Sequence, residues 1–144
     1  EFGRYAETNS KRKCGKKPET FDFLGFTFYC GKGKKSGNFC VKLKTNRKKF
    51  QQKLKVVKEW LYENSTMPVK ELIAKLNTKL VGHYRYYGVS HNIAKIGAFL
   101  HFVQRYLFKV LNRRSHKQSY TWDGYIEMLK VYPLAKPKIY VKLF

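Results

Sequence analysis

The apolar residues between Asn92 and Arg113 recur at helical spacing for about six turns, and this repeat constrains the fold more than any other feature. The stripe that they form on one side of a helix is Ile93, Ile96, Leu100, Val103, Leu107, Val110 and Leu111. The cations on the far side are Lys95, Arg105, Lys109 and Arg113. A helix with one apolar face must bury that face against other elements, so the segment predicts a packed helix, with Asn92 as its N-cap.

Two more segments carry the same period. Thr45 is the expected N-cap of a helix whose inner stripe is Phe50, Leu54, Val57 and Leu61. A second helix is expected to start near Pro68 and to end at Gly88, and its inner face is Leu72, Leu76, Leu80, His83, Tyr84 and Tyr87. A short fourth helix should follow Thr121 and end before Pro133. The fold class is therefore mainly α, a bundle of three to four helices over residues 45–133.

Before the helices, the chain favours β-structure. Residues 21–30 and 39–44 are rich in aromatic and β-branched side chains, and a glycine-rich basic segment, residues 31–38, connects them. This pattern predicts a β-hairpin with a basic tip, preceded by a short strand at Phe2–Ala6 and a loop. Residues 1–44 thus form one region ahead of the bundle, and residues 134–144 form a basic, apolar tail of no predicted structure.

The charge of the chain points to a polyanionic partner. There are 31 Lys and Arg against 9 Asp and Glu, a net charge of +22, while 43% hydrophobic and 17% aromatic residues exclude a disordered basic tail. Eleven cations and no acid lie between Asp22 and Glu59, and nine cations and no acid lie between Glu71 and Asp123. Like charges in such long spans repel one another, and binding to phosphates offsets that repulsion. Nucleic acid is preferred over the alternatives, an anionic membrane surface or simple solubility.

Catalytic residues and metal ligands are not expected in this chain. Its only aspartates are Asp22 and Asp123, so the adjacent pair that holds two metal ions in a polymerase is absent. The four histidines have no i,i+4 ligand spacing, and the three cysteines have no zinc-finger spacing. We therefore expect no cofactor, no membrane span and a reducing, cytoplasmic setting. A small nuclease with a Cys-His pair is a weaker alternative, because sequence does not show spatial proximity.

The second helix gives the basic residues a direction. On a helical wheel Tyr84 and Tyr87 fall on the core side, and His83 falls there too, as a histidine with its hydrogen bonds satisfied. The outward surface, on which a base can stack or a phosphate can be held, is Lys75, Lys79, Gly82, Arg85 and Tyr86. An ordinary solvated face is the alternative reading. The other candidate nucleic-acid-binding residues are Lys32, Lys34 and Lys35 in the hairpin tip, Arg47, Lys48 and Lys49 at a helix start, and Arg105, Lys109, Arg113 and Arg114.

Two motifs carry a resemblance to a known family. Phe21–Phe28, with the sequence FDFLGFTF, and Gly82–Gly88, with the sequence GHYRYYG, resemble segments of group II intron reverse transcriptase-maturases. The resemblance runs from about Phe2 to Pro137. It implies that residues 1–44 are the end of a palm, with a primer-grip-like hairpin at Phe23, Leu24, Gly25 and Phe26, and that residues 45–133 are a thumb or maturase domain.

The function that this resemblance implies is binding. Such a domain contacts group II intron RNA during splicing and the template-primer duplex during reverse transcription. The partner modules would be the fingers and palm of a parent RNA-directed DNA polymerase, which would need Mg²⁺, in a bacterial-type nucleoprotein in the cytoplasm. The alternative is a stand-alone splicing cofactor or RNA chaperone that has no polymerase partner.

Overall fold

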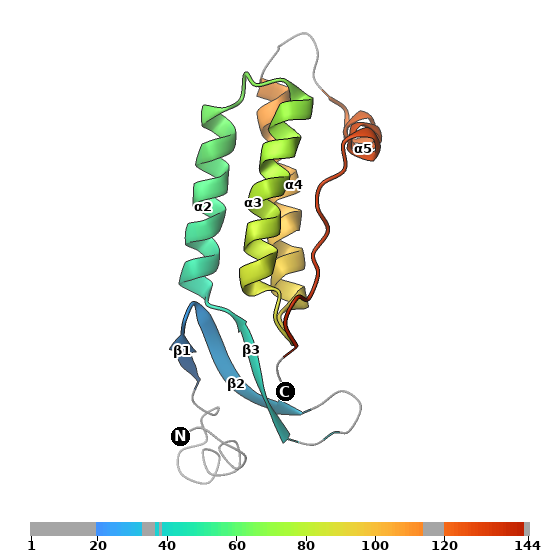
Figure 1. Cartoon of the computed structure of the whole chain (residues 1–144). Coiled ribbons are helices and arrows are strands. Elements are labelled where there is room, and N and C mark those ends of the chain that lie inside the picture. The colour runs from blue at the N-terminus through green and yellow to red at the C-terminus, as the bar shows by residue number, and fades with distance from the viewer. Residues whose placement is uncertain (1–19, 33–36, 38, 114–119, 143–144) are drawn as a thin grey trace.

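The computed structural model describes residues 20–32, 37, 39–113 and 120–142. Three long helices lie side by side above a small sheet (Figure 1). The helices are α2 (Arg47–Glu63), α3 (Val69–Tyr87), α4 (Ile93–Arg113) and the shorter α5 (Trp122–Val131). The prediction of a mainly α fold with β-structure ahead of it is confirmed. The predicted strand at Phe2–Ala6 and the candidates Lys34, Lys35 and Arg114 lie outside the described residues.

The sheet is antiparallel, in the order β1 (Phe21–Phe23), β2 (Phe26–Lys32) and β3 (Phe39–Thr45). The predicted hairpin corresponds to the pairing of β2 with β3. A single strand over residues 21–30 was wrong, because Phe23 pairs with Phe26 and leaves a two-residue turn at Leu24 and Gly25. Both turn residues have positive φ, +53° and +83°, which matches the twist of a tight hairpin and favours glycine at the second position.

Helix α4 is the centre of the core, and α2 and α3 both pack against it. The predicted inner stripes of α2 and α3 are buried except for Phe50, which is partly exposed. In α4, however, Ile93 is 49% exposed and Phe99, which the predicted stripe left out, is 1% exposed. Phe99 moves the centre of the stripe around the helix, so Ile93 and Leu100 lie at its edge rather than at its middle.

The helix ends are set by specific polar contacts. The N-cap of α2 is Asn46, whose Oδ1 accepts from the amides of Lys48 and Lys49. Thr45, the predicted cap, is instead the last residue of β3. Pro68 and Gly88 flank α3 as predicted, and a Cβ on Gly88 would collide with carbonyl oxygens of α3 and of the tail. Helix α5 follows Thr121 as predicted, and Thr121 is its N-cap, with its Oγ1 accepting from the amide of Gly124.

Asn92 joins three elements at one buried point. It stands just before α4, as predicted, but its side chain does not cap that helix. Its Oδ1 accepts from the Thr45 amide at 2.8 Å, and its Nδ2 donates to Thr45 Oγ1 and to the Tyr87 carbonyl, each at 2.8 Å. The ends of β3 and α3 are thereby fixed to the start of α4.

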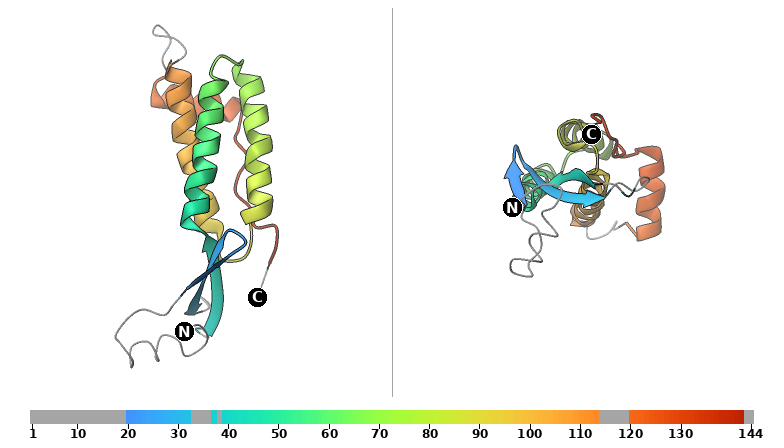
Figure 2. Two further views of the ribbon diagram at one scale, coloured as in Figure 1. Left: turned by 90° about the vertical axis from the view of Figure 1, so that its left-hand side faces the viewer. Right: turned by 90° about the horizontal axis from the view of Figure 1, so that it is seen from below.

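Helix α5 and the tail lie on the side of the bundle away from α2, as the two views of Figure 2 and Figure 1 agree. The hydroxyl of Tyr125 in α5 donates to the Gln104 carbonyl of α4 at 2.7 Å. The tail then runs back along α3, where its Ala135 carbonyl accepts a hydrogen bond from the Tyr84 hydroxyl. Further on, Val141 of the tail forms a parallel β-bridge with Val89. The tail, which had no predicted structure, is therefore packed against the bundle.

Candidate nucleic-acid interface

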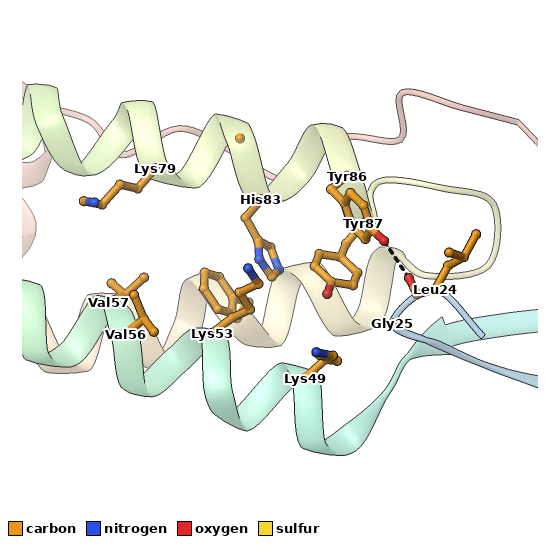
Figure 3. Close-up of a pocket in the computed structure, with 12 residues that line it drawn as sticks. Leu24, Gly25, Lys49, Lys53, Val56, Val57, Lys79, His83, Tyr86 and Tyr87 are labelled. Atoms are coloured by element: carbon orange, nitrogen blue, oxygen red, sulfur yellow. Dashed lines mark hydrogen bonds between the residues drawn. The ribbon is translucent and has the colours of Figure 1, made fainter. Parts of the chain in front are cut away.

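A groove of about 770 Å³ lies between α2 and α3, and we call it the α2–α3 groove (Figure 3). The β1–β2 turn closes the end of the groove next to the sheet, and α4 forms its floor. The lining residues are Leu24, Gly25, Lys49, Lys53, Val56, Val57, Lys79, Gly82, His83, Tyr86, Tyr87 and Phe99. Both lining helices pack on α4, so the width of the groove follows from where α4 holds them.

Three lysines line this groove from two helices. Lys49 and Lys53 are one turn apart on α2, toward the β1–β2 turn, and Lys79 lies on α3 toward the other end of the groove, across from Val56 and Val57 (Figure 3). The Nζ of Lys79 lies 4.9 Å from the centre of the Trp60 ring of α2, a cation–π contact that draws it across the groove. No carboxylate lines the groove. An anion that enters it meets positive charge on both sides and no repelling group.

The α3 wall of the groove contains a buried imidazole, which rests on the α4 floor. His83 is 9% exposed and stacks on Phe99 with ring centres 3.7 Å apart and planes 8° apart. Its Nε2 is buried and has no hydrogen-bond partner among the described residues. Burial, with the charge of Lys53 as a second cause, lowers the pKa of His83 to about 4. The predicted inner position of His83 is confirmed, but the prediction that its hydrogen bonds are satisfied was wrong, since the core on that side is aromatic and supplies no polar partner.

The β1–β2 turn is fixed to α3 by Tyr86. The Tyr86 hydroxyl donates to the Leu24 carbonyl at 2.7 Å (Figure 3), and its ring stacks on Phe26 with ring centres 5.9 Å apart. A Cβ on Gly25 would lie 3.0 Å from the Tyr87 hydroxyl oxygen. Glycine there serves the positive φ and the contact with Tyr87. Of the four residues predicted to be primer-grip-like, Leu24 and Gly25 line one end of the groove, and Phe23 and Leu24 are 59% and 67% exposed.

The predicted nucleic-acid-binding residues fall on several surfaces. Lys49, Lys79, Gly82 and Tyr86 come together in the α2–α3 groove, whereas Lys75 and Arg85 are exposed outside its lining. Lys53 was missed, although its position four residues after Lys49 places it on the same face of α2.

Arg47 and Lys48 lie on another side of α2. They line a second hollow of about 760 Å³ that also contains Lys44, Lys95 and the carboxylate of Asp22. The three consecutive cations at the start of α2 thus divide between two surfaces, because successive residues of a helix point 100° apart.

Arg105 and Lys109 line a third, smaller hollow of about 430 Å³, the α4–α5 hollow, with His101, Phe108 and Trp122. Trp122 is 51% exposed there. Arg113 lies over the Tyr62 ring, 5.0 Å from its centre, and Lys32 is exposed at the end of β2. These candidates do not share a surface with the α2–α3 groove.

The described residues contain no group of three or more His, Cys, Asp or Glu side chains arranged to hold a metal ion. The same part of the chain has no helix that is both long and apolar enough to cross a bilayer.

Comparison with known proteins gives one family. Residues 47–125 match the family described as the group II intron, maturase-specific domain. The match begins at the first residue of α2 and ends in α5, so it covers more than half of the chain and both helices that form the walls of the groove. Neither the curated proteins nor the solved structures gave a significant match.

Proposed function

Since the chain belongs to the group II intron maturase-specific domain family, we propose that it binds group II intron RNA and helps that RNA to reach its splicing-competent fold. We propose further that it is the thumb of a reverse transcriptase and also contacts the template-primer duplex. In that setting polymerisation and its Mg²⁺ belong to the fingers and palm of the parent protein, and this chain contributes binding within a cytoplasmic nucleoprotein.

The observation that carries the proposal is that Lys49, Lys53 and Lys79 lie along one groove whose lining contains no carboxylate. Each lysine that neutralises a phosphate also releases condensed counterions, which favours association at low salt. The groove lies wholly on the helices that the family match covers, apart from the β1–β2 turn at its end.

The β1–β2 turn supports the second part of the proposal. Tyr86 connects this turn to α3, so a strand that follows the groove would meet Leu24 and Gly25 at its end. This position suits a primer grip, because the turn is held by the same helix that lines the groove.

The test is the salt dependence of RNA affinity. The chain should bind a group II intron RNA with an affinity that falls by orders of magnitude between about 50 and 200 mM salt if six or more phosphates are held. Changing Lys49, Lys53 and Lys79 together to Gln should make the slope of log affinity against log salt less negative by about two to three. An unchanged slope would contradict a role of the groove in holding phosphates.

The matched control changes Lys55, Lys70 and Lys130 to Gln, which removes the same charge at exposed positions outside the groove. This variant should keep most of the slope. An unrelated structured RNA of equal length, tested in parallel, separates intron recognition from general RNA binding, and equal affinity for the two RNAs would favour the chaperone alternative.

A further inference from the structure

The buried Nε2 of His83 is a polar atom without a partner among the described residues, in the wall of a groove that is open to solvent. Buried polar groups in folded proteins are almost always hydrogen-bonded, and those that are not often mark a functional site. Phenylalanine would stack on Phe99 equally well and would leave no unpaired atom. Histidine at this position is therefore better explained by a bound group than by packing.

The groups around His83 keep it neutral and in place. Phe99 of α4 stacks on one side, Tyr87 lies 4.7 Å away between ring centres, and Tyr84 contacts it edge-on. Lys53 of α2 is the charged group that faces it. A neutral imidazole offers one N–H donor and one acceptor nitrogen, so it can bond to either kind of polar atom on a ligand.

The walls of the groove suit a flat, mostly apolar ligand with an anionic end. Val56 and Val57 supply an apolar side on α2, and Val56 is 58% exposed. Gly82 opens the opposite wall, because a Cβ built there would meet nothing within 4 Å. Lys49, Lys53 and Lys79 supply the positive charge. A phosphate backbone alone would need the lysines but not the apolar walls or the imidazole.

We propose that the α2–α3 groove receives one unpaired nucleotide of the bound RNA, whose base enters between the walls, shifts the side chains that cover His83 Nε2 and places a polar edge on that atom, while its phosphate lies at Lys49 and Lys53. An unpaired nucleotide combines a flat base, a polar base edge and an anionic phosphate, which are the three features that the groove complements. The inference rests on the proposed function, since it names what part of the RNA this groove selects.

The test compares two RNA hairpins of equal length, one fully paired and one with a single unpaired nucleotide in its stem. The wild-type chain should bind the second hairpin about tenfold more tightly at fixed salt, which is a typical effect of placing one base against protein side chains. His83→Phe should remove this preference and leave affinity for the fully paired hairpin unchanged. Thermal melting of each variant shows whether it is folded.

A second variant blocks the groove without touching the core. Gly82→Leu places a side chain at the open wall and should also abolish the preference. Ala94→Leu introduces the same leucine side chain at an exposed position of α4 outside the groove and should keep the preference. If His83→Phe does not fold, the comparison of Gly82→Leu with Ala94→Leu decides.

The outcomes separate the two proposals. Tight, salt-dependent binding of both hairpins with no preference would overturn this inference and leave RNA binding intact. Failure to bind either hairpin or the intron RNA would overturn the proposed function and this inference with it. A preference that survives in folded His83→Phe, or in Gly82→Leu, would also overturn the inference.

Discussion

The α2–α3 groove and the α4–α5 hollow have similar compositions and different constructions. Each combines cations, a histidine and aromatic rings. In the hollow, His101, Arg105 and Lys109 all come from α4, and they surround the exposed ring of Trp122. In the groove, cations from two helices line the two walls, and an imidazole between them is 9% exposed. The difference shows that a single helix can place several cations on one surface. A groove with a buried side chain in its wall, by contrast, is formed here by two helices that a third helix holds apart.

The two regions are also fastened differently. Asn92, at the groove end of the bundle, makes three hydrogen bonds and is fully buried. Asn112, near the other end, accepts one hydrogen bond, from the Tyr120 amide at 2.7 Å. If the shape of the groove depends on hydrogen bonds between distant parts of the chain, loss of Asn92 should destabilise the protein more than loss of Asn112.

Asn92→Ala should therefore destabilise the chain most. It leaves the Thr45 amide buried without its acceptor and removes one of the two hydrogen bonds to the Tyr87 carbonyl, at a cost of about 3 kcal/mol in the free energy of unfolding, and Asn112→Ala should cost about 1 kcal/mol. Chemical denaturation of the two variants measures both values. Equal losses would show that the two ends of the bundle are fastened equally well.

The buried His83 should make the free energy of unfolding depend on pH. The folded pKa of His83 is about 4 and its ordinary value is 6.5, so between these values the unfolded chain binds the proton more strongly and protonation favours unfolding. Above pH 6.5 His83 is neutral in both states and does not reduce the free energy of unfolding. As the pH falls from 6.5 to 4, up to about 3 kcal/mol of this free energy is lost. Unfolding free energies measured over this range should fall less steeply for His83→Phe than for the wild type. Identical curves would mean that His83 is not buried as described.

Substitution of an aromatic residue should also cost more stability at the groove than at the hollow, although by a smaller amount than for the asparagines. Tyr86→Phe removes the hydrogen bond to the Leu24 carbonyl and should cost about 1 kcal/mol, with weaker binding of a primer-template duplex. Trp122→Phe, at the hollow, should change stability by less than about 0.5 kcal/mol. Melting temperatures and duplex affinities test the pair. A larger effect from Trp122→Phe would reverse the contrast between an anchored ring and an exposed one.

The smallest expected effect is a gain. Gly82→Ala in the wall of the groove and Gly97→Ala in α4 both place a methyl group in open space within a helix, so each should stabilise the fold by about 0.5–1 kcal/mol. If Gly82→Ala alone also weakens binding to RNA with an unpaired nucleotide, the openness of that wall matters for function. Destabilisation by Gly82→Ala would show that the wall is more crowded than the structure describes.

The sequence by itself determined the number and faces of the helices, the inward positions of His83, Tyr84 and Tyr87, and the basic character of the surface. These properties follow from periodicity and composition, which are local. The turn at Leu24 and Gly25 was missed because the segment was assigned to one strand, although the aromatic alternation shifts by one residue between Phe23 and Phe26, the two residues that pair across the turn. The predicted stripe of α4 included Ile93 and left out Phe99, because Phe99 faces partners that the sequence does not identify.

Only the tertiary structure decided which cations share a site. Lys49 and Lys79 are 30 positions apart in the chain, and they line the same groove because α2 and α3 both pack on α4 at the separation that its side chains impose. The unpaired state of His83 Nε2 and the three bonds of Asn92 depend on the same long-range contacts. A helical wheel gives the direction of each side chain from its own axis, but the distance between two axes is set by the core that lies between them.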